Sequence, residues 1–343
     1  MEIKLTQYSK SAGCGCKIAP SNLEEILKTA DTQNLFPGLI VGNETKDDAA
    51  IMEINEQQCL ISTADFFMPI VDDAFDFGRI SAANAISDVY AMGGKPIMAL
   101  GILGWPVEKI PLQEARRVME GAREICLSAK IPLAGGHSID SPEPFFGLSV
   151  NGIIQKNEIK KNTGSKIGDV LYLSKKLGSG ILATAIKRGL LGKEHYQELL
   201  QSLCTLNFAG EKLGKLEYVH AITDITGFGF IGHLAEMLQE DGIAAEIEYK
   251  SLPKFSAVEE YMSKFIYPDN TTRNYNTFKN WVEGMDGLEF LLLCDPQTNG
   301  GLLVSVNENN TQDFEKEMKS IEVEFTRIGK IIENRNKKIK ILQ

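Results

Sequence analysis

The chain has 343 residues, and its 36 basic and 46 acidic side chains give a formal net charge of −10 at pH 7. This length predicts about two domains. A hydrophobic content of 43% is enough for a sizeable core and excludes global disorder. The acidic balance argues against nucleic acid and anionic membranes as partners, because either needs a clustered basic face. Composition also excludes a collagen, a coiled coil and a disulfide scaffold.

The amino-terminal MEIKLTQYSK has no apolar run of signal-peptide length, and the longest apolar stretch, Ile97 to Val107, is too short to cross a bilayer. Six cysteines are spread thinly along the chain. Three of them, Cys59, Cys126 and Cys294, sit inside apolar runs, which predicts burial as small hydrophobic side chains. We therefore expect a cytoplasmic protein in a reducing compartment.

In chain order, Pro20 and Ser21 open a predicted helix in which Ser21 and Glu24 form a capping box. The other elements expected before residue 155 are strands at 49–54 and 59–66, a helix at 78–92, a strand at 97–103, a helix at 112–129, and strands at 131–134 and 146–154. The loop GGHSIDSPEP is expected between the last two strands.

A polar, lysine-rich segment at 155–169 breaks the periodicity and is the best candidate for a domain boundary. After it we expect a strand at 170–174, helices near 179–190 and 196–216, a Gly-rich turn before a helix that ends at Leu238, and strands near 301–306 and 328–332. This mixture predicts an α+β or mixed α/β fold. The expected organisation is a flexible Gly- and Cys-containing lid at 1–20, an amino-terminal domain at 21–156, a linker at 157–168 and a carboxy-terminal α/β domain at 169–343.

The sharpest local motif is GCGCK, in which Cys14 and Cys16 flank one glycine and Lys17 follows directly. A nearby ammonium group raises the thiolate fraction of a cysteine, which favours a reactive thiol. Two other interpretations stay open. The motif is also compatible with a tail that carries incidental cysteines, or with half of a zinc site, although no second Cys/His pair follows at metal spacing.

Aspartates form a second group, comprising Asp47 and Asp48 before the first strand, Asp65 at the end of the second, Asp88 on the next helix and Asp224 in ITDITGFG. Carboxylates at strand ends and helix turns are the usual ligands of Mg²⁺, which binds a few of them together with nucleotide phosphates. Asn84 and Asp88 are four residues apart and share one helix face. Each aspartate alone is more readily a cap or a solvated charge, but Asp88 has mostly apolar neighbours, and a buried charge needs a partner.

Two glycine-rich turns, GGHS at 135–138 and TGFGFIGH at 226–233, offer backbone N–H groups of the kind that bind phosphate. Neither turn matches the Walker A pattern, so each alone is weak evidence for phosphate binding. A single histidine such as His137 is more often structural than functional. The thiol, the lysine, the carboxylates and these turns together indicate Mg²⁺-assisted phosphoryl transfer without naming the acceptor.

Seven blocks in order resemble the selenophosphate synthetase (selenide, water dikinase) family: LTQYSKSAGCGCK, VGNETKDDAA, ISTADFFMPIVDD, FDFGRISAANAISDVYAMGGKP, LAGGHSIDSPEP, TDITGFGFIGHLAEM and CDPQTNGGLL. The resemblance covers the chain from residue 4 to about residue 304. It implies the two-domain fold of the aminoimidazole ribonucleotide synthetase-like superfamily. In that fold two amino-terminal domains pair into a β-barrel in a homodimer, and ATP binds in the cleft between the domains.

The reaction that the resemblance implies converts ATP, selenide and water into selenophosphate, AMP and orthophosphate. Selenophosphate is the selenium donor for selenocysteine and for selenium-modified tRNA. The implied cofactors are several Mg²⁺ ions bound with ATP, with room for a monovalent cation such as K⁺. The implied partners are ATP, selenide and a second copy of the chain, and a selenium-delivery protein is compatible with them.

Position by position, the resemblance implies catalytic roles for Cys14 and Lys17, while Cys16 matches a family thiol with a less essential role. The implied magnesium ligands are Asp48, Asp88 and Asp224. The implied ATP-binding positions are Lys17, Thr45, Lys46, Asp47, Asp65, Asp88, Gly136, His137 and Ser138. The sequence departs from the family block at Asn299, where relatives more often carry Ser.

Two alternative functions stay open. The first is another ATP-dependent kinase or ligase of the same superfold, such as thiamine-monophosphate kinase, whose members lack GCGCK. The second is a non-catalytic selenium or thiol carrier, which has no need of Asp48, Asp88 and Asp224. The final nucleotide separates the first alternative from the main interpretation, because a kinase leaves ADP and the dikinase leaves AMP.

Overall fold

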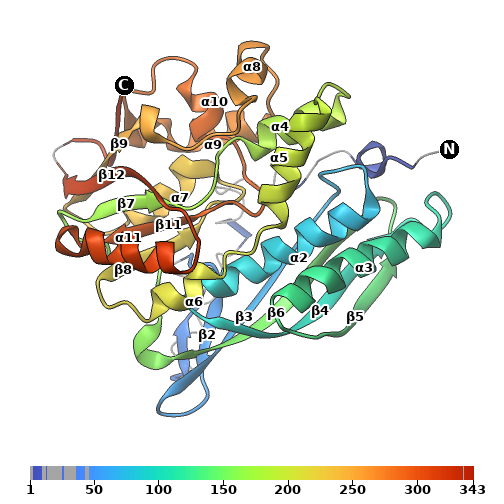
Figure 1. The fold of residues 1–343 in the computed structure, drawn as a ribbon, viewed down its shortest axis with the longest axis horizontal. Coiled ribbons are helices and arrows are strands. Elements are labelled where there is room, and N and C mark those ends of the chain that lie inside the picture. The colour runs from blue at the N-terminus through green and yellow to red at the C-terminus, as the bar shows by residue number, and fades with distance from the viewer. Residues whose placement is uncertain (1–2, 10–12, 14–24, 27–35, 43–45, 335) are drawn as a thin grey trace.

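A computed structural model of the chain has two mixed sheets with helices packed against them (Figure 1). The structure describes residues 3–9, 13, 25–26, 36–42, 46–334 and 336–343. The capping box predicted at Ser21 lies outside these residues, as does all of GCGCK except Gly13.

The amino-terminal half forms a six-stranded sheet with the strand order β1-β2-β3-β6-β4-β5. Its elements, with the short 3-10 turns beside them, are η1 (Leu5–Tyr8), β1 (Leu39–Val41), β2 (Ala50–Glu53), β3 (Gln58–Phe67), α2 (Ala74–Ala91), β4 (Lys95–Trp105), α3 (Leu112–Ser128), β5 (Leu133–Asp140), β6 (Phe145–Gln155) and η4 (Lys156–Glu158). The neighbouring strands are antiparallel, except that β4 and β5 run parallel. The strands predicted at 49–54, 59–66, 97–103 and 146–154 and the helix at 112–129 are confirmed.

Both helices lie on one face of this sheet and pack closely against each other (Figure 1). A Cβ atom on Gly121 would lie 2.0 Å from the carbonyl oxygen of Phe75, so this approach of α3 to α2 requires glycine. The helix α2 begins at Ala74 rather than at the predicted residue 78, because the Asp73 side chain accepts a hydrogen bond from the Asp76 N–H and caps the helix.

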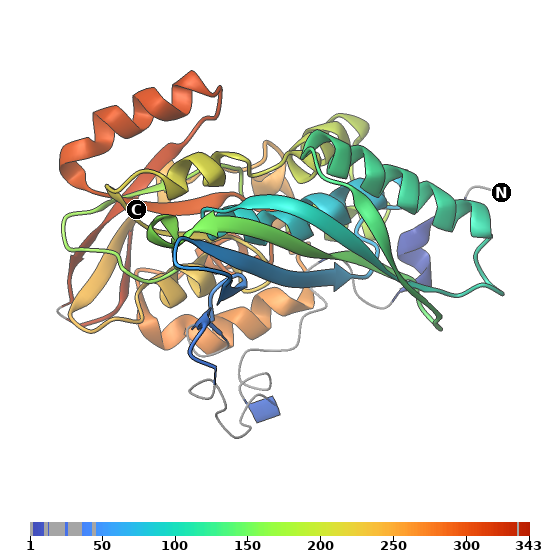
Figure 2. The ribbon, with the colours of Figure 1, turned by 90° about the horizontal axis from the view of Figure 1, so that it is seen from below.

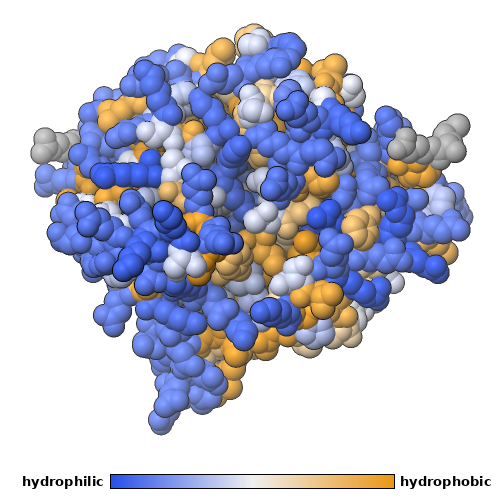
Figure 3. All heavy atoms as spheres, viewed as in Figure 1, coloured by the Kyte–Doolittle hydropathy of each residue, from blue (hydrophilic) through white to orange (hydrophobic). Residues whose placement is uncertain are grey.

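Among the described helices none lies over the opposite face of the sheet, as Figure 2 shows for β3 and β6. Side chains alternate along β3, so that Ser62, Ala64 and Phe66 are exposed on this uncovered face. The exposed large apolar side chains on the strands of this sheet, or directly beside them, are Met52, Ile54, Phe66, Ile97, Leu100 and Ile139. Figure 3 shows hydrophobic residues along the lower edge of the molecule, over the same strands.

The prediction for the GGHS segment is wrong. Instead of a short strand at 131–134 followed by a loop, β5 continues through residue 140 and pairs with β4 from Gly101↔Gly136 to Trp105↔Asp140. The parallel partner supplies hydrogen bonds to the backbone of this polar segment, which its own composition does not reveal. GGHS therefore lies in an edge strand and not in a turn.

The carboxy-terminal half forms a seven-stranded sheet with the order β10-β13-β9-β12-β7-β11-β8. Its elements are β7 (Val170–Leu173), α4 (Ser179–Lys187), α5 (Lys193–Cys204), α6 (Ala209–Gly214), β8 (Val219–Asp224), α7 (Gly229–Met237), β9 (Ile243–Glu248), η5 (Tyr249–Ser251), α8 (Val258–Ser263), α9 (Asp269–Phe278), η6 (Lys279–Trp281), β10 (Val282–Glu283), α10 (Glu289–Leu293), β11 (Leu302–Val306), η7 (Glu308–Asn310), α11 (Thr311–Ser320), β12 (Thr326–Glu333) and β13 (Ile339–Leu342). The strands predicted at 170–174, 301–306 and 328–332 are confirmed.

The single helix predicted near 196–216 is instead two helices, α5 and α6, separated by residues 205–208. In this break the Asn207 side chain donates to Ser87 Oγ of α2 at 2.7 Å and to the Gly300 carbonyl at 2.9 Å. These contacts join the two halves of the molecule, and the local sequence does not show them.

The two faces of the carboxy-terminal sheet pack against different helices. Val170 and Tyr172 of β7 belong to a cluster with Phe314 and Met318 of α11, whereas Leu171 and Leu173 belong to the main core. Because β7 is buried on both faces, its sequence is continuously apolar and does not alternate between apolar and polar residues. Within the described residues no helix is both long and apolar enough to span a bilayer.

Candidate functional site

The candidate site lies where α2 and β3 of the first sheet meet the end of β8 in the second. Asp48 is its centre, because the charges of Asp224, Asp88, Glu236 and Asp47 all act on it. Asp88 and Asp224 are buried, and Asp48 has one carboxylate oxygen, Oδ2, that is out of contact with water and accepts no hydrogen bond. The fold thus brings together the three aspartates that the sequence predicted as magnesium ligands.

Asn84 and Asp88 share one face of α2, as predicted, and the structure shows that this face is turned toward β3. Thr63 Oγ1 donates to Asp88 Oδ2 at 2.6 Å, and Asn84 Nδ2 donates to Asp65 Oδ2 at 2.7 Å. Thr63 and Asp65 are two residues apart on β3 and so point to the same face of the sheet. A helix face and a strand face therefore hold two carboxylates in fixed orientations.

Asp224 is the last residue of β8 and is connected to the first half of the molecule by hydrogen bonds. The Ser87 hydroxyl donates to Asp224 Oδ2, and Ser87 in turn accepts from Asn207 Nδ2. The hydroxyl of the adjacent Thr223 donates to Asp48 Oδ1 at 3.2 Å. The site is thus part of the contact between the two halves, and a change in their packing would change the spacing of the carboxylates.

Hydrogen bonds from Asn162 fix the backbone of residues 46–48 at the site. Lys46 has a φ of 56°, in the left-handed region, and Asn162 Nδ2 donates to its carbonyl oxygen at 3.0 Å. The N–H of Asn162 donates to Asp47 Oδ1 at 2.8 Å. The segment that precedes β2 is therefore attached to the region between the two sheets.

Sequence reasoning missed Glu236, which raises the negative charge near Asp48. Glu236 lies on α7, and its Oε2 is 3.0 Å from His233 Nδ1. His233 Nε2 lies 3.2 Å from the hydroxyl of Thr226. In the sequence, the three-residue spacing of His233 and Glu236 places both side chains on one helix face, and this spacing is the feature that could have indicated a role for Glu236.

Asn299 was noted only as a departure from the family, but the structure connects it to the site. Its N–H donates to Asn84 Oδ1 at 2.6 Å, and Asn84 holds Asp65. Asn299 has a φ of 44°, a conformation that asparagine adopts more readily than most residues. Its side chain donates to the carbonyls of Leu203 and Thr205, which fixes the turn.

The electrostatics of the cluster fit a cation. Burial raises the pKa of Asp48 well above its ordinary value, and the neighbouring carboxylates raise it further, because ionising Asp48 adds charge beside charge. A divalent cation would remove this cost, and the buried, unpaired Asp48 Oδ2 offers it a ligand. No three His, Cys, Asp or Glu side chains in the described parts of the chain form a ready-made metal cage, so other oxygens have to complete the coordination.

The other predicted site residues are distributed as follows. Lys46, Asp47 and Asp65 lie at or beside the carboxylates. Cys14, Lys17 and Thr45 lie outside the described residues. Gly136, His137 and Ser138 lie on β5, and His137 is exposed, so it is not a core histidine. The strand pairs Asp65↔Leu148, Leu148↔Gly101 and Gly101↔Gly136 put Gly136 three strands, roughly 14 Å, from Asp65.

A second buried carboxylate, Asp295, supports the segment that carries Asn299. Asp295 Oδ2 accepts hydrogen bonds from the N–H of Gly180 at 2.9 Å and from Gln297 Nε2 at 2.8 Å, whereas Oδ1 is buried and unpaired. Burial raises the pKa of Asp295 to about 8, despite these hydrogen bonds. Burial of Asp295 therefore favours its protonated form.

Comparison with known proteins finds relatives that match both halves of the chain. Residues 46–154 match the family described as AIR synthase related protein, N-terminal domain, and residues 166–341 match its C-terminal domain. The chain is 48% identical over 340 residues to the selenide, water dikinase of Photorhabdus laumondii, covering 99% of this chain and 98% of that protein. It is 52% identical over 304 residues to the selenide, water dikinase of Yersinia pseudotuberculosis, covering 89% and 87%.

The fold is also similar to the crystal structure of thiamine monophosphate kinase from Aquifex aeolicus, with a TM-score of 0.65 over 94% of each chain. The two sequences are 18% identical, so this likeness shows the fold alone.

Replacing Asp48 by asparagine is expected to stabilise the metal-free protein. The change removes one charge from the buried cluster, so the midpoint of thermal unfolding should rise by a few degrees, or roughly 1–2 kcal/mol. Mg²⁺ with ATP should stabilise the wild type and have a much smaller effect on Asp48→Asn. Differential scanning calorimetry measures both effects, with the exposed Asp286→Asn as the matched control. A lowered midpoint, or undiminished stabilisation by Mg²⁺ and ATP, would contradict this account.

Asp295 is expected to make folding stability depend on pH. Its folded pKa of about 8 exceeds the ordinary value of 3.8, so its contribution is most favourable at low pH and is lost as pH rises toward 8. Relative to Asp295→Asn, the wild type should lose on the order of 3 kcal/mol between pH 5.5 and 8. Urea unfolding at several pH values measures the difference, with the exposed Asp241→Asn as control. A constant difference across this range would show that Asp295 has an ordinary pKa.

Proposed function

Because the chain belongs to the selenide, water dikinase family of AIR synthase related proteins, we propose that it converts ATP, selenide and water into selenophosphate, AMP and orthophosphate. The observation that carries the proposal is the cluster of Asp48, Asp88 and Asp224 between the two sheets. ATP is highly anionic, so it can bind beside three carboxylates only if cations lie between them. The product is the selenium donor for selenocysteine and for selenium-modified tRNA.

The proposed magnesium ligands are Asp48, Asp88 and Asp224. When bound, Mg²⁺ neutralises charge on the phosphates and orients them for transfer. The protein's part is to hold the carboxylates: Thr63 orients Asp88, Ser87 orients Asp224, and Thr223 orients Asp48. Several Mg²⁺ ions, and a monovalent cation such as K⁺, are in keeping with the number of carboxylates near Asp48.

Cys14 and Lys17 are proposed as the catalytic residues for selenium. The proposal rests on the GCGCK motif, in which the ammonium group of Lys17 follows the thiols closely. We assign Cys14 to holding selenide and Lys17 to neutralising charge on the phosphate that is transferred. Thr45, Lys46, Asp47 and Asp65 are proposed to contact ATP, and a selenium-delivery protein is a compatible partner.

A homodimer is proposed through the uncovered face of the first sheet. Phe66, Leu100 and Ile139 are 49%, 36% and 50% exposed there, and a second copy packed on this face would cover them. β5 lies at the edge of the sheet among the described strands, so a second copy can pair with the backbone groups on its outer side. Two such sheets placed face to face would bury both apolar surfaces and form the shared β-barrel.

The dimer also gives a role to the nucleotide contacts on β5. Gly136 lies three strands from Asp65, so within one chain Gly136, His137 and Ser138 are not at the carboxylates. Since β5 lies at the edge of the sheet, we propose that these residues contact the nucleotide across the subunit interface.

The proposed organisation along the chain is a lid at 1–20, an amino-terminal domain at 21–156, a linker at 157–168 and a carboxy-terminal domain at 169–343. The two family matches, at 46–154 and 166–341, support the boundary. We also propose the cytoplasm as the compartment, which the four free, buried cysteines Cys59, Cys126, Cys204 and Cys294 support.

The function is tested by following the nucleotide that the protein makes from ATP and Mg²⁺ with and without selenide. Selenide-dependent AMP is expected, whereas ADP as the final product would favour a simple kinase, and no turnover would favour a carrier. In this assay Cys14→Ser should lower the rate of selenide-dependent AMP formation by roughly 100-fold or more, because a hydroxyl is a far weaker nucleophile than a thiolate.

Cys16→Ser is the matched control, since it changes the other thiol of the same motif and should keep most of the activity. Full activity of Cys14→Ser would remove Cys14 from the proposed catalytic set without changing the proposed reaction.

The dimer is tested by placing a charge on the uncovered face. Leu100→Glu should convert the dimer to a monomer, because a carboxylate would be buried in an apolar interface. Leu127→Glu is the control, since Leu127 is 77% exposed on α3, on the opposite side of the sheet. Light scattering after gel filtration gives the molar mass. A monomeric wild type, or a Leu100→Glu variant that stays dimeric, would disprove the proposed interface.

A further inference from the structure

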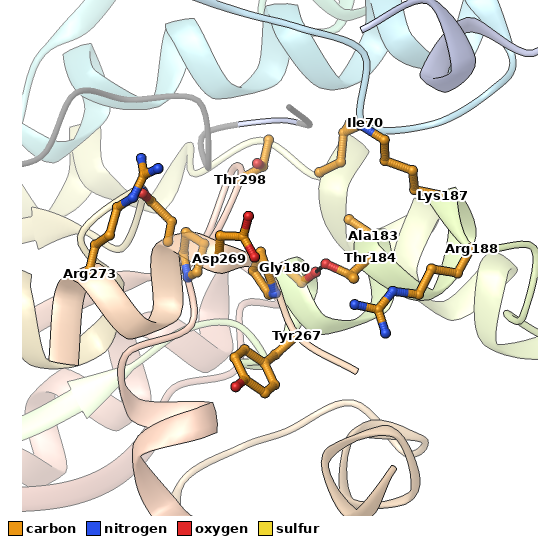
Figure 4. A pocket seen from close by; sticks show the side chains of 13 residues that line it. Ile70, Gly180, Ala183, Thr184, Lys187, Arg188, Tyr267, Asp269, Arg273 and Thr298 are labelled. Atoms are coloured by element: carbon orange, nitrogen blue, oxygen red, sulfur yellow. Dashed lines mark hydrogen bonds between the residues drawn. The ribbon is translucent and has the colours of Figure 1, made fainter. Parts of the chain in front are cut away.

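A cavity of about 330 Å³ with both polar and apolar lining lies between the length of α4 and the first turn of α9, and Ile70 of the amino-terminal half also lines it (Figure 4). The volume is enough for a small organic molecule. Three basic side chains, Lys187, Arg188 and Arg273, and one acidic side chain, Asp269, line it. This local excess of positive charge stands out in a chain whose formal net charge is −10.

The two arginines of this cavity are available for a ligand. Figure 4 shows Arg188 and Arg273 on opposite sides of the cavity, with Asp269 and Thr298 between them. Both arginines are exposed, and neither guanidinium group has a carboxylate partner in the part of the chain that the structure describes. Lys187 is different, since its Nζ donates to the Ser9 carbonyl at 2.8 Å. A planar guanidinium group binds a carboxylate through two parallel hydrogen bonds.

The cavity also offers hydrogen-bond acceptors. Asn270 is 5% exposed and lines the cavity, and its Oδ1 is buried without a hydrogen-bond partner. The Asp269 carboxylate lies beside it in the first turn of α9. An inorganic anion carries few or no donors for these oxygens, whereas an amino acid or a small peptide carries N–H groups as well as carboxylates. The lining is therefore complementary to a small peptide and not to a simple anion.

The cavity adjoins the start of the GCGCK motif. The Gly13 N–H donates to the Met68 carbonyl at 3.0 Å. A Cβ atom on Gly13 would lie 2.6 Å from Thr298 Oγ1 and 2.8 Å from Ile70 Cδ1, and both Thr298 and Ile70 line the cavity. Gly13 is the residue before Cys14 in the sequence. The cavity thus lies beside the residue from which the chain continues to the proposed catalytic thiol.

We propose that this cavity binds the selenium donor as a small peptide thiol that carries selenium, with its carboxylates on Arg188 and Arg273 and its N–H groups on Asn270 and Asp269. The selenium assigned to the ligand rests on the proposed function, whereas the binding of a peptide thiol to this cavity does not depend on it. It commits to binding alone and places the donor beside Gly13.

S-Methylglutathione is a suitable probe, because it has two carboxylates, an ammonium group and amide N–H groups but no reactive thiol. Isothermal titration calorimetry with the full chain should detect its binding, and Arg188→Gln with Arg273→Gln should weaken it at least about tenfold. The control is Arg116→Gln, which changes an exposed arginine on α3. Inorganic phosphate and acetate are the comparison ligands, and thermal midpoints establish that each variant is folded.

The kinetic arm uses selenium supplied as the glutathione selenopersulfide, with dithiothreitol, a dithiol without carboxylates, as the two-electron reductant that converts the selenopersulfide to glutathione and selenide. The double variant should raise the KM for this donor at least about tenfold and leave kcat and the KM for ATP unchanged. No binding of the probe to the wild type, equal binding to the double variant, or binding of phosphate or acetate as strong as that of the probe would overturn the proposal. Arginine-dependent binding by a chain that forms no selenide-dependent AMP would refute the proposed function and, with it, the selenium assigned to this cavity.

Discussion

Mutual repulsion among carboxylates is the constraint on which the rest of this structure depends. Asp48, Asp88 and Asp224 come from three separate elements, and Asp47 and Glu236 add their charge to the same place. Removing such groups from water costs free energy, and crowding like charges together costs more. The fold offsets part of this cost with hydroxyl donors, namely Thr63 to Asp88, Ser87 to Asp224 and Thr223 to Asp48. Hydrogen bonds from neutral groups leave the net charge of the cluster unchanged, so the repulsion remains, and the cations proposed to bind with ATP would offset it.

The same hydrogen bonds join the two halves of the molecule. Ser87 belongs to α2 and Asp224 to β8, and Asn207 connects Ser87 to the turn at Gly300. The helix α2 is buried nearly all round, because the first sheet, α3 and the carboxy-terminal half all pack against it. Its hydrophobic face therefore cannot be read as a simple stripe. The polar residues Asn84 and Ser87 are buried because they bind Asn299 and Asp224 across the interface, whereas Asp88 is buried against Thr63 of β3. The packing of the two halves therefore determines the geometry of the carboxylates.

The sequence predicted the parts of this arrangement that depend on local pattern. The strand at 59–66, the helix at 112–129 and the shared face of Asn84 and Asp88 follow from the patterns of strands and helices. It failed where distant partners decide the conformation. GGHS is a strand because β4 pairs with it, and the helix near 196–216 breaks because Asn207 turns toward Ser87. Glu236 and Asn299 were not identified as site residues, because their contacts join positions far apart in the sequence. Cys14 and Lys17 were identified by a motif and a family resemblance, and their roles rest on those alone.

Residues in uncommon backbone conformations lie at both ends of the site. Lys46, next to Asp47, and Asn299, which holds Asn84, have positive φ values of 56° and 44°. Such conformations persist only where surrounding contacts fix them. Asn162 binds the carbonyl of Lys46, and the carbonyls of Leu203 and Thr205 hold the side chain of Asn299. Strained turns, buried charges and an unpaired oxygen on Asp48 all lower the stability of the empty protein. Cations bound to these carboxylates, as proposed above, would recover part of this stability.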